Sequence, residues 1–277
     1  MFKTLLAACI LISTSSYAST QSLSDIVAER SEEVKKRDVY RNPQQTIEFF
    51  KIVPKMSVAE ALPGGGWYTK IIAPYIGAEG SVHGINYNDD MWARFGFFSE
   101  ANIAERIAST AKFPDQVAEI VSPAPTSSGF TFATPPESLK GSLDRVLFIR
   151  ALHNLNRFES EAGTMSQAIT TAHSLLKEGG MVGIVQHRAP ENAEDDWANG
   201  SRGYLKQSSV ISQFEQGGFK LVATSEINAN PNDKPTSSDI VWRLPPSYNG
   251  ANGDPEKVAL ADAIGESDRM TLLFVKQ

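Results

Sequence analysis

The segment from Asp144 to Leu152, DRVLFIRAL, is the strongest indication of how this chain folds. Its centre, VLFI, is a continuous apolar run and lacks the polar alternation of a strand with one face in water. Such runs are typical of strands that are buried on both faces, as in parallel sheets. This one segment therefore favours a sheet with helices on both sides.

The rest of the chain supplies the elements that such a sheet needs. Strand-like apolar runs are followed by helix-like patterns along most of the sequence, which predicts strand–helix–strand units with parallel pairing. We expect strands at residues 56–62, 80–87, 130–134, 144–152, 181–187, 219–227 and 269–277. We expect helices at residues 22–41, 43–52, 67–77, 91–120 (with a break at 112–114), 160–180 and 208–218.

Length and composition predict one α/β domain. The chain has 277 residues, of which 41% are hydrophobic and 21% are charged, and this is enough to bury a substantial core. We assign residues 19–277 to a single domain, with a helical extension at about 22–52 and a long loop insertion at about 228–266. Loops of this length in compact domains are often lids. Together with KRDVYRNP (residues 36–43), we expect this one to close over a pocket.

The N-terminal segment has the features of an export signal. Lys3 precedes an apolar run from Leu5 to Ile12, and small residues end at Ala18, so we expect residues 1–18 to be a signal peptide and the chain to be exported to a bacterial periplasm. The stretch LAAC matches a lipoprotein box, but the apolar run before it is too short. Cys9 is the only cysteine, so no disulfide framework or cysteine metal site is expected.

Charge restricts the possible partners. The formal net charge is −6, and no cluster of Lys and Arg is longer than KKR at residues 35–37. This argues against nucleic acid and anionic membranes as partners. No membrane span is expected, because the N-terminal apolar run is too short for one. The expected partner is a small molecule, and the sequence carries no signal for an oligomeric state.

The stretch VAEALPGGGWYT, from Val58 to Thr69, predicts a turn between a strand and a helix. Glycines allow a ligand to approach the backbone closely, and the following helix offers free N–H groups. The spacing of Gly64–Gly66 excludes the dinucleotide fingerprint, which requires G-x-G-x-x-G, and the P-loop, which requires Gly-Lys-Ser/Thr. A glycine triplet alone is also compatible with a tight turn that binds no ligand.

The order of these motifs resembles that of the class I S-adenosylmethionine-dependent methyltransferases. EALPGGG matches the family's first motif at Glu60, Gly64 and Gly66, although Leu62 stands where the first glycine is expected. DRVLFIRALHNL looks like the family's fourth strand, SLLKEGGMVGIVQH like its fifth strand and the turn before it, GFKLV like its sixth and RMTLLFVK like its seventh. The resemblance implies a seven-stranded, mostly parallel, doubly wound Rossmann-like sheet with an antiparallel last strand.

More narrowly, the chain is similar to a group of exported predicted methyltransferases. The motif GESDRM of this group contains Glu266, Asp268 and Arg269, which either brace the last strand through ion pairs or contact the substrate, and we favour the brace. The other shared motifs are PGGGWYT at Pro63–Thr69, HN at His153–Asn154, HRA at His187–Ala189 and NANP at Asn228–Pro231.

The resemblance implies S-adenosylmethionine as the cofactor. Asn86 and Tyr87 end the second strand, where family members usually place Asp or Glu to bind the ribose hydroxyls. An asparagine pairs with hydroxyls more weakly than a carboxylate does. The implied cofactor-binding residues are Glu60, Pro63, Gly64, Gly65, Gly66, Asn86 and Tyr87.

Two histidines are the candidate catalytic residues. His153 and His187 each follow a buried strand, where an imidazole could act as the general base for a hydroxyl or amine acceptor. Each could equally be a structural residue bonded to a neighbouring loop. Their spacing fits no metal-binding motif, so no metal site is expected.

Four more residues are candidates for substrate binding. Trp67 and Tyr68 could face the pocket, since aromatic rings attract a sulfonium, or could pack in the core. Arg188 could hold an anionic substrate, and Asn154 lies beside His153.

These inferences predict an exported enzyme that transfers a methyl group from S-adenosylmethionine to a small-molecule acceptor. The alternative is a non-catalytic small-ligand-binding protein that has retained the fold. Leu62, Asn86 and the export signal favour this alternative, because the first two depart from the cofactor-binding pattern and the cofactor is made in the cytosol.

Overall fold

The computed structural model describes residues 21–251 and 253–277 of the chain. The expected signal peptide at residues 1–18, with Cys9, therefore lies outside the described residues. Among the helices in the described ranges, none is both long enough and apolar enough to cross a membrane.

Seven strands form one sheet in the order β3-β2-β1-β4-β5-β8-β7, and a short strand, β6, pairs with β5. Strands β1 to β5 pair in parallel, whereas β8 runs antiparallel to both β5 and β7. This confirms the predicted mostly parallel sheet with an antiparallel last strand, to which β6 is an addition. The strands are β1 (Ser57–Ala61), β2 (Ser81–Asn86), β3 (Thr126–Thr131), β4 (Leu143–Ile149), β5 (Leu176–Ala189), β6 (Leu205–Lys206), β7 (Phe219–Ser225) and β8 (Arg269–Lys276).

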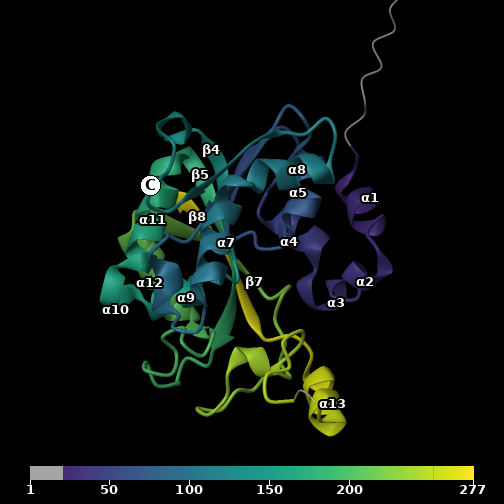
Figure 1. Ribbon diagram of the computed structural model, residues 1–277, viewed down its shortest axis with the longest axis vertical. Coiled ribbons are helices and arrows are strands. Elements are labelled where there is room, and N and C mark those ends of the chain that lie inside the picture. The colour runs from purple at the N-terminus through teal and green to yellow at the C-terminus, as the bar shows by residue number, and fades with distance from the viewer. Residues whose placement is uncertain (1–20, 252) are drawn as a thin grey trace, which may run out of the picture.

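Helices cover both faces of this sheet, as the apolar centre of β4 predicts (Figure 1). One apolar core joins the strands to α1, α4, α5 and α8, and a second joins them to α6, α9, α11 and α12. Leu147 in β4 belongs to the first core and Val146 and Phe148 to the second, and all three are fully buried. These helices are α1 (Leu23–Ala28), α4 (Pro43–Phe49), α5 (Thr69–Ile76), α6 (Met91–Arg94), α8 (Phe113–Ile120), α9 (Leu152–Arg157), α11 (Thr164–Leu175) and α12 (Gln207–Gln216); α7 (Glu100–Ala111) and α10 (Glu159–Ala162) complete the layers.

The N-terminal extension consists of several short helices, and the single helix predicted for residues 22–41 is wrong. After α1 come α2 (Glu32–Lys35) and α3 (Asp38–Arg41). The Ser31 hydroxyl accepts a hydrogen bond from the Val34 N–H and so starts a new helix inside the predicted one. Asn42, with a φ of 39°, then separates α3 from α4, which begins at Pro43 as predicted.

Two other predicted boundaries differ from the structure. The segment 228–266 is not a loop throughout, because it contains the short 3-10 helix Val241–Arg243 and α13 (Pro255–Ile264). The Asp254 side chain caps α13, and Pro255 occupies its first position, where a proline is well tolerated although it resembles a loop residue in the sequence. Strand β3 begins at Thr126, before the predicted residues 130–134.

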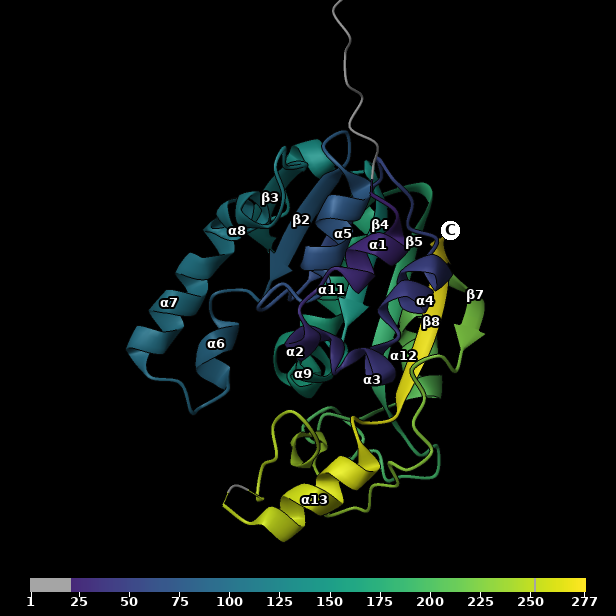
Figure 2. The ribbon, with the colours of Figure 1, turned by 90° about the vertical axis from the view of Figure 1, so that its right-hand side faces the viewer.

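The segment that contains α13 lies beyond the carboxyl ends of the parallel strands (Figure 2). Strand β8 starts at the same edge, because Arg269 pairs in register with His187 near the end of β5. The late part of the chain therefore passes over this edge of the sheet before it enters the sheet as β8.

Two glycines allow helices to lie unusually close to β2 and β3. A Cβ atom on Gly129 in β3 would lie 1.8 Å from the carbonyl oxygen of Thr110 in α7, and one on Gly84 in β2 would lie 2.6 Å from the Phe113 ring. A side chain at Gly129 would require the backbone of α7 to move, and one at Gly84 would displace the Phe113 ring. The end of α7 and the start of α8 are thus held directly against the sheet.

We predict that Gly129→Ala lowers the free energy of unfolding by about 2–3 kcal/mol, because the methyl group must push the backbone of α7 away. Urea denaturation followed by circular dichroism measures this change. Thr126→Ala, at an exposed position of the same strand, is the control and should change stability by about 0.5 kcal/mol or less. Equal stability of the two variants would contradict the close packing.

Candidate active site

The turn between β1 and α5 has a left-handed backbone at three residues. The φ angles are 55° at Leu62, 56° at Gly64 and 71° at Gly66. In this region a leucine is strained by roughly 1–2 kcal/mol, whereas a glycine is not. The turn therefore has, at Leu62, the backbone conformation that suits the glycine expected at this position. The Leu62 N–H donates to the Ile85 carbonyl at 2.7 Å, which ties the turn to β2.

Three cavities border this turn. One of about 520 Å³ lies against the outer side of Gly64–Gly66 and the start of α5, and the other two, of about 770 Å³ (the larger cavity) and about 280 Å³ (the smaller cavity), share five lining residues. Leu62, Pro63, Gly64, Arg150 and His153 line both of these. These two cavities are therefore adjoining compartments at the carboxyl ends of the central strands, which is where open parallel sheets bind their ligands. Their sizes are in the range of small-molecule sites.

The smaller cavity combines an aromatic surface with amide groups. Trp92 lines it, and the Arg106 guanidinium lies 5.0 Å from the centre of the Trp92 ring. Asn86 lines it as well; its Nδ2 donates to Thr110 Oγ1 and its Oδ1 accepts from the Tyr87 N–H, both at 2.9 Å. Each amide atom of Asn86 keeps one further hydrogen-bonding position.

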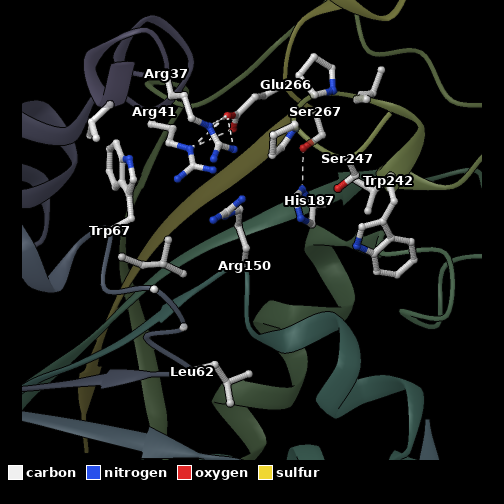
Figure 3. Close-up of a pocket in the computed structure, with 18 of the residues that line it drawn as sticks. Arg37, Arg41, Leu62, Trp67, Arg150, His187, Trp242, Ser247, Glu266 and Ser267 are labelled. Carbon is white, nitrogen blue, oxygen red and sulfur yellow. Dashed lines mark hydrogen bonds and ion pairs between the residues drawn. The ribbon is translucent and has the colours of Figure 1, made fainter. Parts of the chain in front are cut away.

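The larger cavity brings the two predicted histidines together. The ring centres of His153 and His187 are 5.5 Å apart. His187 Nδ1 is hydrogen-bonded to Ser267 Oγ at 2.5 Å (Figure 3). The Nδ1 atom of His153 is buried and has no hydrogen-bond partner among the residues that the structure describes.

Both imidazoles are neutral at pH 7. Burial lowers the pKa of His153 to about 4. Burial also lowers the pKa of His187 well below 6.5, and the charges of His153 and Arg150 lower it further. A neutral imidazole has one nitrogen that can accept a proton, so the protonation state is the one that a general base requires.

Glu266 joins three arginines at the edge of the larger cavity, and Figure 3 shows two of them, Arg37 and Arg41. Arg41 Nε lies 3.2 Å from both carboxylate oxygens, Arg37 Nε donates at 2.7 Å and Arg269 Nη1 at 3.0 Å. Burial raises the pKa of Glu266, but the arginines lower it by more, and the net pKa is below its usual value. The contact between Glu266 and Arg269 is the ion-paired brace that the GESDRM motif predicts.

Two guanidinium groups lie over the ring of Trp67, which also lines the larger cavity. The central guanidinium carbons of Arg30 and Arg41 are 4.9 and 4.7 Å from the ring centre. The ring thus already makes cation–π contacts with protein groups and fixes the position of both arginines.

Most of the predicted site residues line the two cavities. Of the predicted residues, Pro63, Gly64 and His153 line both cavities; Gly65, Trp67 and His187 line the larger one, and Asn86, Tyr87 and Asn154 line the smaller one. Glu60, Gly66, Tyr68 and Arg188 line neither.

Glu60 lies beneath the turn. It is 4% exposed, and its Oε2 accepts a hydrogen bond from Thr69 Oγ1 at 2.6 Å. Burial raises the pKa of Glu60 to about 7. In this structure the carboxyl group holds the start of α5 against the end of β1.

Tyr68 and Arg188 point to other parts of the protein. The Tyr68 hydroxyl donates to the Arg41 carbonyl at 3.3 Å, within the apolar core. Arg188 forms ion pairs with Asp268 at 2.8 Å and Glu226 at 2.7 Å. These contacts place Arg188 on the outer side of β5, away from the histidine pair.

Sequence reasoning missed Arg150, Trp92 and Trp242, all of which line the cavities. Arg150 follows β4 directly and has a φ of 56°. The feature of the sequence that could have identified Arg150 is its position, as a charged residue at the end of a buried strand. Trp242 belongs to the segment of residues 228–266, which we call the late segment. The centre of its ring lies 5.7 Å from that of His153, and no local pattern in the sequence indicates that proximity.

No family model and no curated protein sequence matches this chain. Solved structures do. A geranyl diphosphate C-methyltransferase from Streptomyces coelicolor A3(2) has a TM-score of 0.52 at 13% identity, over 90% of this chain and 85% of that one. An S-adenosylmethionine-dependent methyltransferase from Aquifex aeolicus has a TM-score of 0.50 at 10% identity, over 93% and 100%. This chain has the methyltransferase fold.

The same fold serves other chemistry as well. The [4+2]-cyclase SpnF also resembles the chain, with a TM-score of 0.50 at 15% identity, over 86% of this chain and 80% of that one. At these identities the likeness establishes the fold alone, so the reaction must be argued from the site. Within residues 21–251 and 253–277, no three His, Cys, Asp or Glu side chains are grouped as a metal site would need.

We predict that neither His153 nor His187 takes up a proton between pH 8 and pH 5.5 in the folded protein. The imidazole proton resonances measured by NMR should stay constant over this range, with His153→Gln and His187→Gln used for assignment. In denaturant the same histidines should titrate near 6.5.

The sign of the linked stability effect follows from these pKa values. The unfolded chain binds protons at these histidines near pH 6.5 and the folded chain does not, so their burial destabilises the fold as the pH falls from 6.5 toward 4. An NMR midpoint near 6.5 for either histidine in the folded protein would contradict the burial described for the pair.

Proposed function

We propose that this protein is an S-adenosylmethionine-dependent methyltransferase that acts on a small molecule. The observation that supports this most strongly is the pair of adjoining cavities at the glycine turn. A group-transfer enzyme needs two neighbouring compartments, one for the donor and one for the acceptor, so that the reacting atoms are aligned. Here the shared wall carries the glycine turn, Arg150 and His153.

The residues of the smaller cavity fit the nucleoside part of such a cofactor. Trp92 provides a flat apolar surface for a base, and Asn86 has unused donor and acceptor positions for ribose hydroxyls. At the turn, a Cβ atom added to Gly65 would meet no other atom within 4 Å. The backbone there borders open space, which the amino-acid part of the cofactor would occupy.

The larger cavity would hold the acceptor. S-adenosylmethionine supplies the electrophilic methyl group when it is bound. His153 or His187 would take the proton of an acceptor hydroxyl or amine, since both are neutral and line the larger cavity. The hydrogen bond between His187 Nδ1 and Ser267 Oγ holds the ring of His187 in one orientation. When Nδ1 is the donor of this bond, Nε2 is the nitrogen that can accept a proton.

A second candidate function is the binding of a small ligand without catalysis. The position of Leu62 favours it, because its side chain lines both cavities in a strained backbone conformation that suits a glycine. A chain that no longer needs the cofactor tolerates such a residue.

We also propose that the protein acts outside the cytoplasm, as a member of the exported group that its motifs resemble. The support is the charged, apolar and small-residue order of residues 1–18.

We predict that S-adenosylhomocysteine binds the purified protein with micromolar affinity in isothermal titration calorimetry and raises its melting temperature. Gly65→Leu should weaken this binding at least about tenfold, because the new side chain fills the open space beside the turn. Absence of both heat and thermal stabilisation up to millimolar ligand would contradict methyl transfer and leave the second candidate.

The matched control for this experiment is Ala101→Leu, at an exposed position in the first turn of α7. It adds the same side chain away from both cavities and should bind as the unmodified protein does. Normal binding by Gly65→Leu would place the cofactor site elsewhere on the protein.

A further inference from the structure

The larger cavity is strongly cationic, although the whole chain carries a net charge of −6. Its lining contains one carboxylate, Glu266, and five cationic side chains. Behind the wall, Asp38 pairs with Arg30 and Arg269 pairs with Glu266. With these two groups included, six cations against two carboxylates leave an excess of four positive charges. The five cationic side chains are Arg30, Arg37, Arg41, Lys70 and Arg150.

Some N–H groups of these cations donate to no acceptor among the described residues. Arg41 Nη2 and Arg30 Nη1 are buried and have no hydrogen-bond partner in the described part of the chain. Unpaired buried donors of charged groups are costly. Burial, together with the charges of Arg150 and Arg37, lowers the pKa of Arg41 to about 9 although Glu266 raises it, which shows that the positive charges of this wall repel one another.

Arg150 is the cation that points most directly into the cavity. Figure 3 shows its side chain extending from the end of β4 toward Arg37, Arg41 and Glu266. Its guanidinium makes no hydrogen bond or ion pair with another residue of the described ranges, while its backbone N–H donates to the Val185 carbonyl at 2.6 Å. A strained φ of 56° at this position is a conformation that functional sites tend to retain.

The opposite side of the same cavity is apolar and comes from the late segment. Trp242, Leu244, Pro245 and Pro246 line it. A ligand that satisfies both sides carries a negative charge at one end and an apolar body at the other.

We propose that the acceptor is an organic anion, with a phosphate or carboxylate held by Arg150 and the arginines beside it and an apolar body against Trp242 and its neighbours. This inference rests on the proposed methyl transfer and names the substrate class for it. S-adenosylmethionine carries one carboxylate, one ammonium and one sulfonium, so its net charge is positive and it does not neutralise the excess charge. An anionic acceptor neutralises part of this charge. It also places negative charge near the sulfonium, which favours the binding of both the acceptor and S-adenosylmethionine.

The test is isothermal titration calorimetry with phenyl phosphate, benzoate and benzamide, each with and without saturating S-adenosylhomocysteine. Benzoate and benzamide have the same shape and differ in charge. We expect phenyl phosphate and benzoate to bind and benzamide to bind about tenfold more weakly or not at all. Equal affinity for benzoate and benzamide would overturn the proposal.

Three variants assign the effect to the cavity. Arg150→Met should weaken phenyl phosphate binding about tenfold, and Arg150→Lys should restore part of it. Arg157→Met removes one cation outside both cavities, where its guanidinium lies 5.0 Å from the Phe158 ring centre, and should leave binding unchanged. If Arg150→Met does not fold, Lys70→Met at the exposed rim provides the same comparison and should weaken binding about threefold.

The two proposals fail separately in this experiment. Binding of S-adenosylhomocysteine without binding of phenyl phosphate overturns the anionic acceptor and leaves methyl transfer in place. Binding of phenyl phosphate that depends on Arg150, without binding of S-adenosylhomocysteine, contradicts methyl transfer and supports the anion site. Phenyl phosphate binding that is unchanged in Arg150→Met and Lys70→Met overturns the assignment of the anion to this cavity.

Discussion

The buried carboxylate of Glu266 is the interaction on which the site depends. It lies between Arg37 and Arg41 of the N-terminal extension and Arg269 at the start of β8. Arg269 also donates to the Tyr40 carbonyl at 2.6 Å. A single carboxylate thus joins the two ends of the described chain above the carboxyl edge of the sheet. Removing it would leave the buried arginines uncompensated, which is strongly destabilising.

This junction explains the shape and charge of the larger cavity. The N-terminal extension supplies Arg30, Arg37 and Arg41, and residues 241–247 supply Trp242 and the prolines. The remaining two cations, Lys70 and Arg150, come from α5 and from the end of β4, close to the glycine turn and the two histidines. Residues of both segments that were expected to close over a pocket, 36–43 and 228–266, line the cavity. We therefore propose that these segments act together with Arg150 in selecting the acceptor.

The centre of the sheet was predictable because its strands contain buried apolar runs, as VLFI in β4 shows. The start of β3 was not, because the residues from Thr126 to Gly129 are small and polar. The glycine turn and the histidines were predictable because they lie at or near the carboxyl ends of apolar strands. Arg150 has the same kind of position and was overlooked, whereas Trp242 and the arginine cluster acquire their roles through contacts with residues far away in the sequence. Contacts that the sequence does not reveal also explain why Glu60 and Arg188 do not line the cavities. Both lie near the end of a strand, as predicted, but hydrogen bonds to Thr69 and Asp268 hold their side chains outside the cavities.

We propose that one composite site lies at the glycine turn. Its nucleoside compartment lies beside Asn86 and Trp92, and its acceptor compartment lies beside Arg150 and His153. A crystal structure of the protein grown with S-adenosylhomocysteine tests it most directly. We expect the ligand to contact Gly64 and Gly65 and its ribose to lie next to Asn86. Ligand density outside both cavities, or only among the arginines with the smaller cavity unchanged, would contradict it.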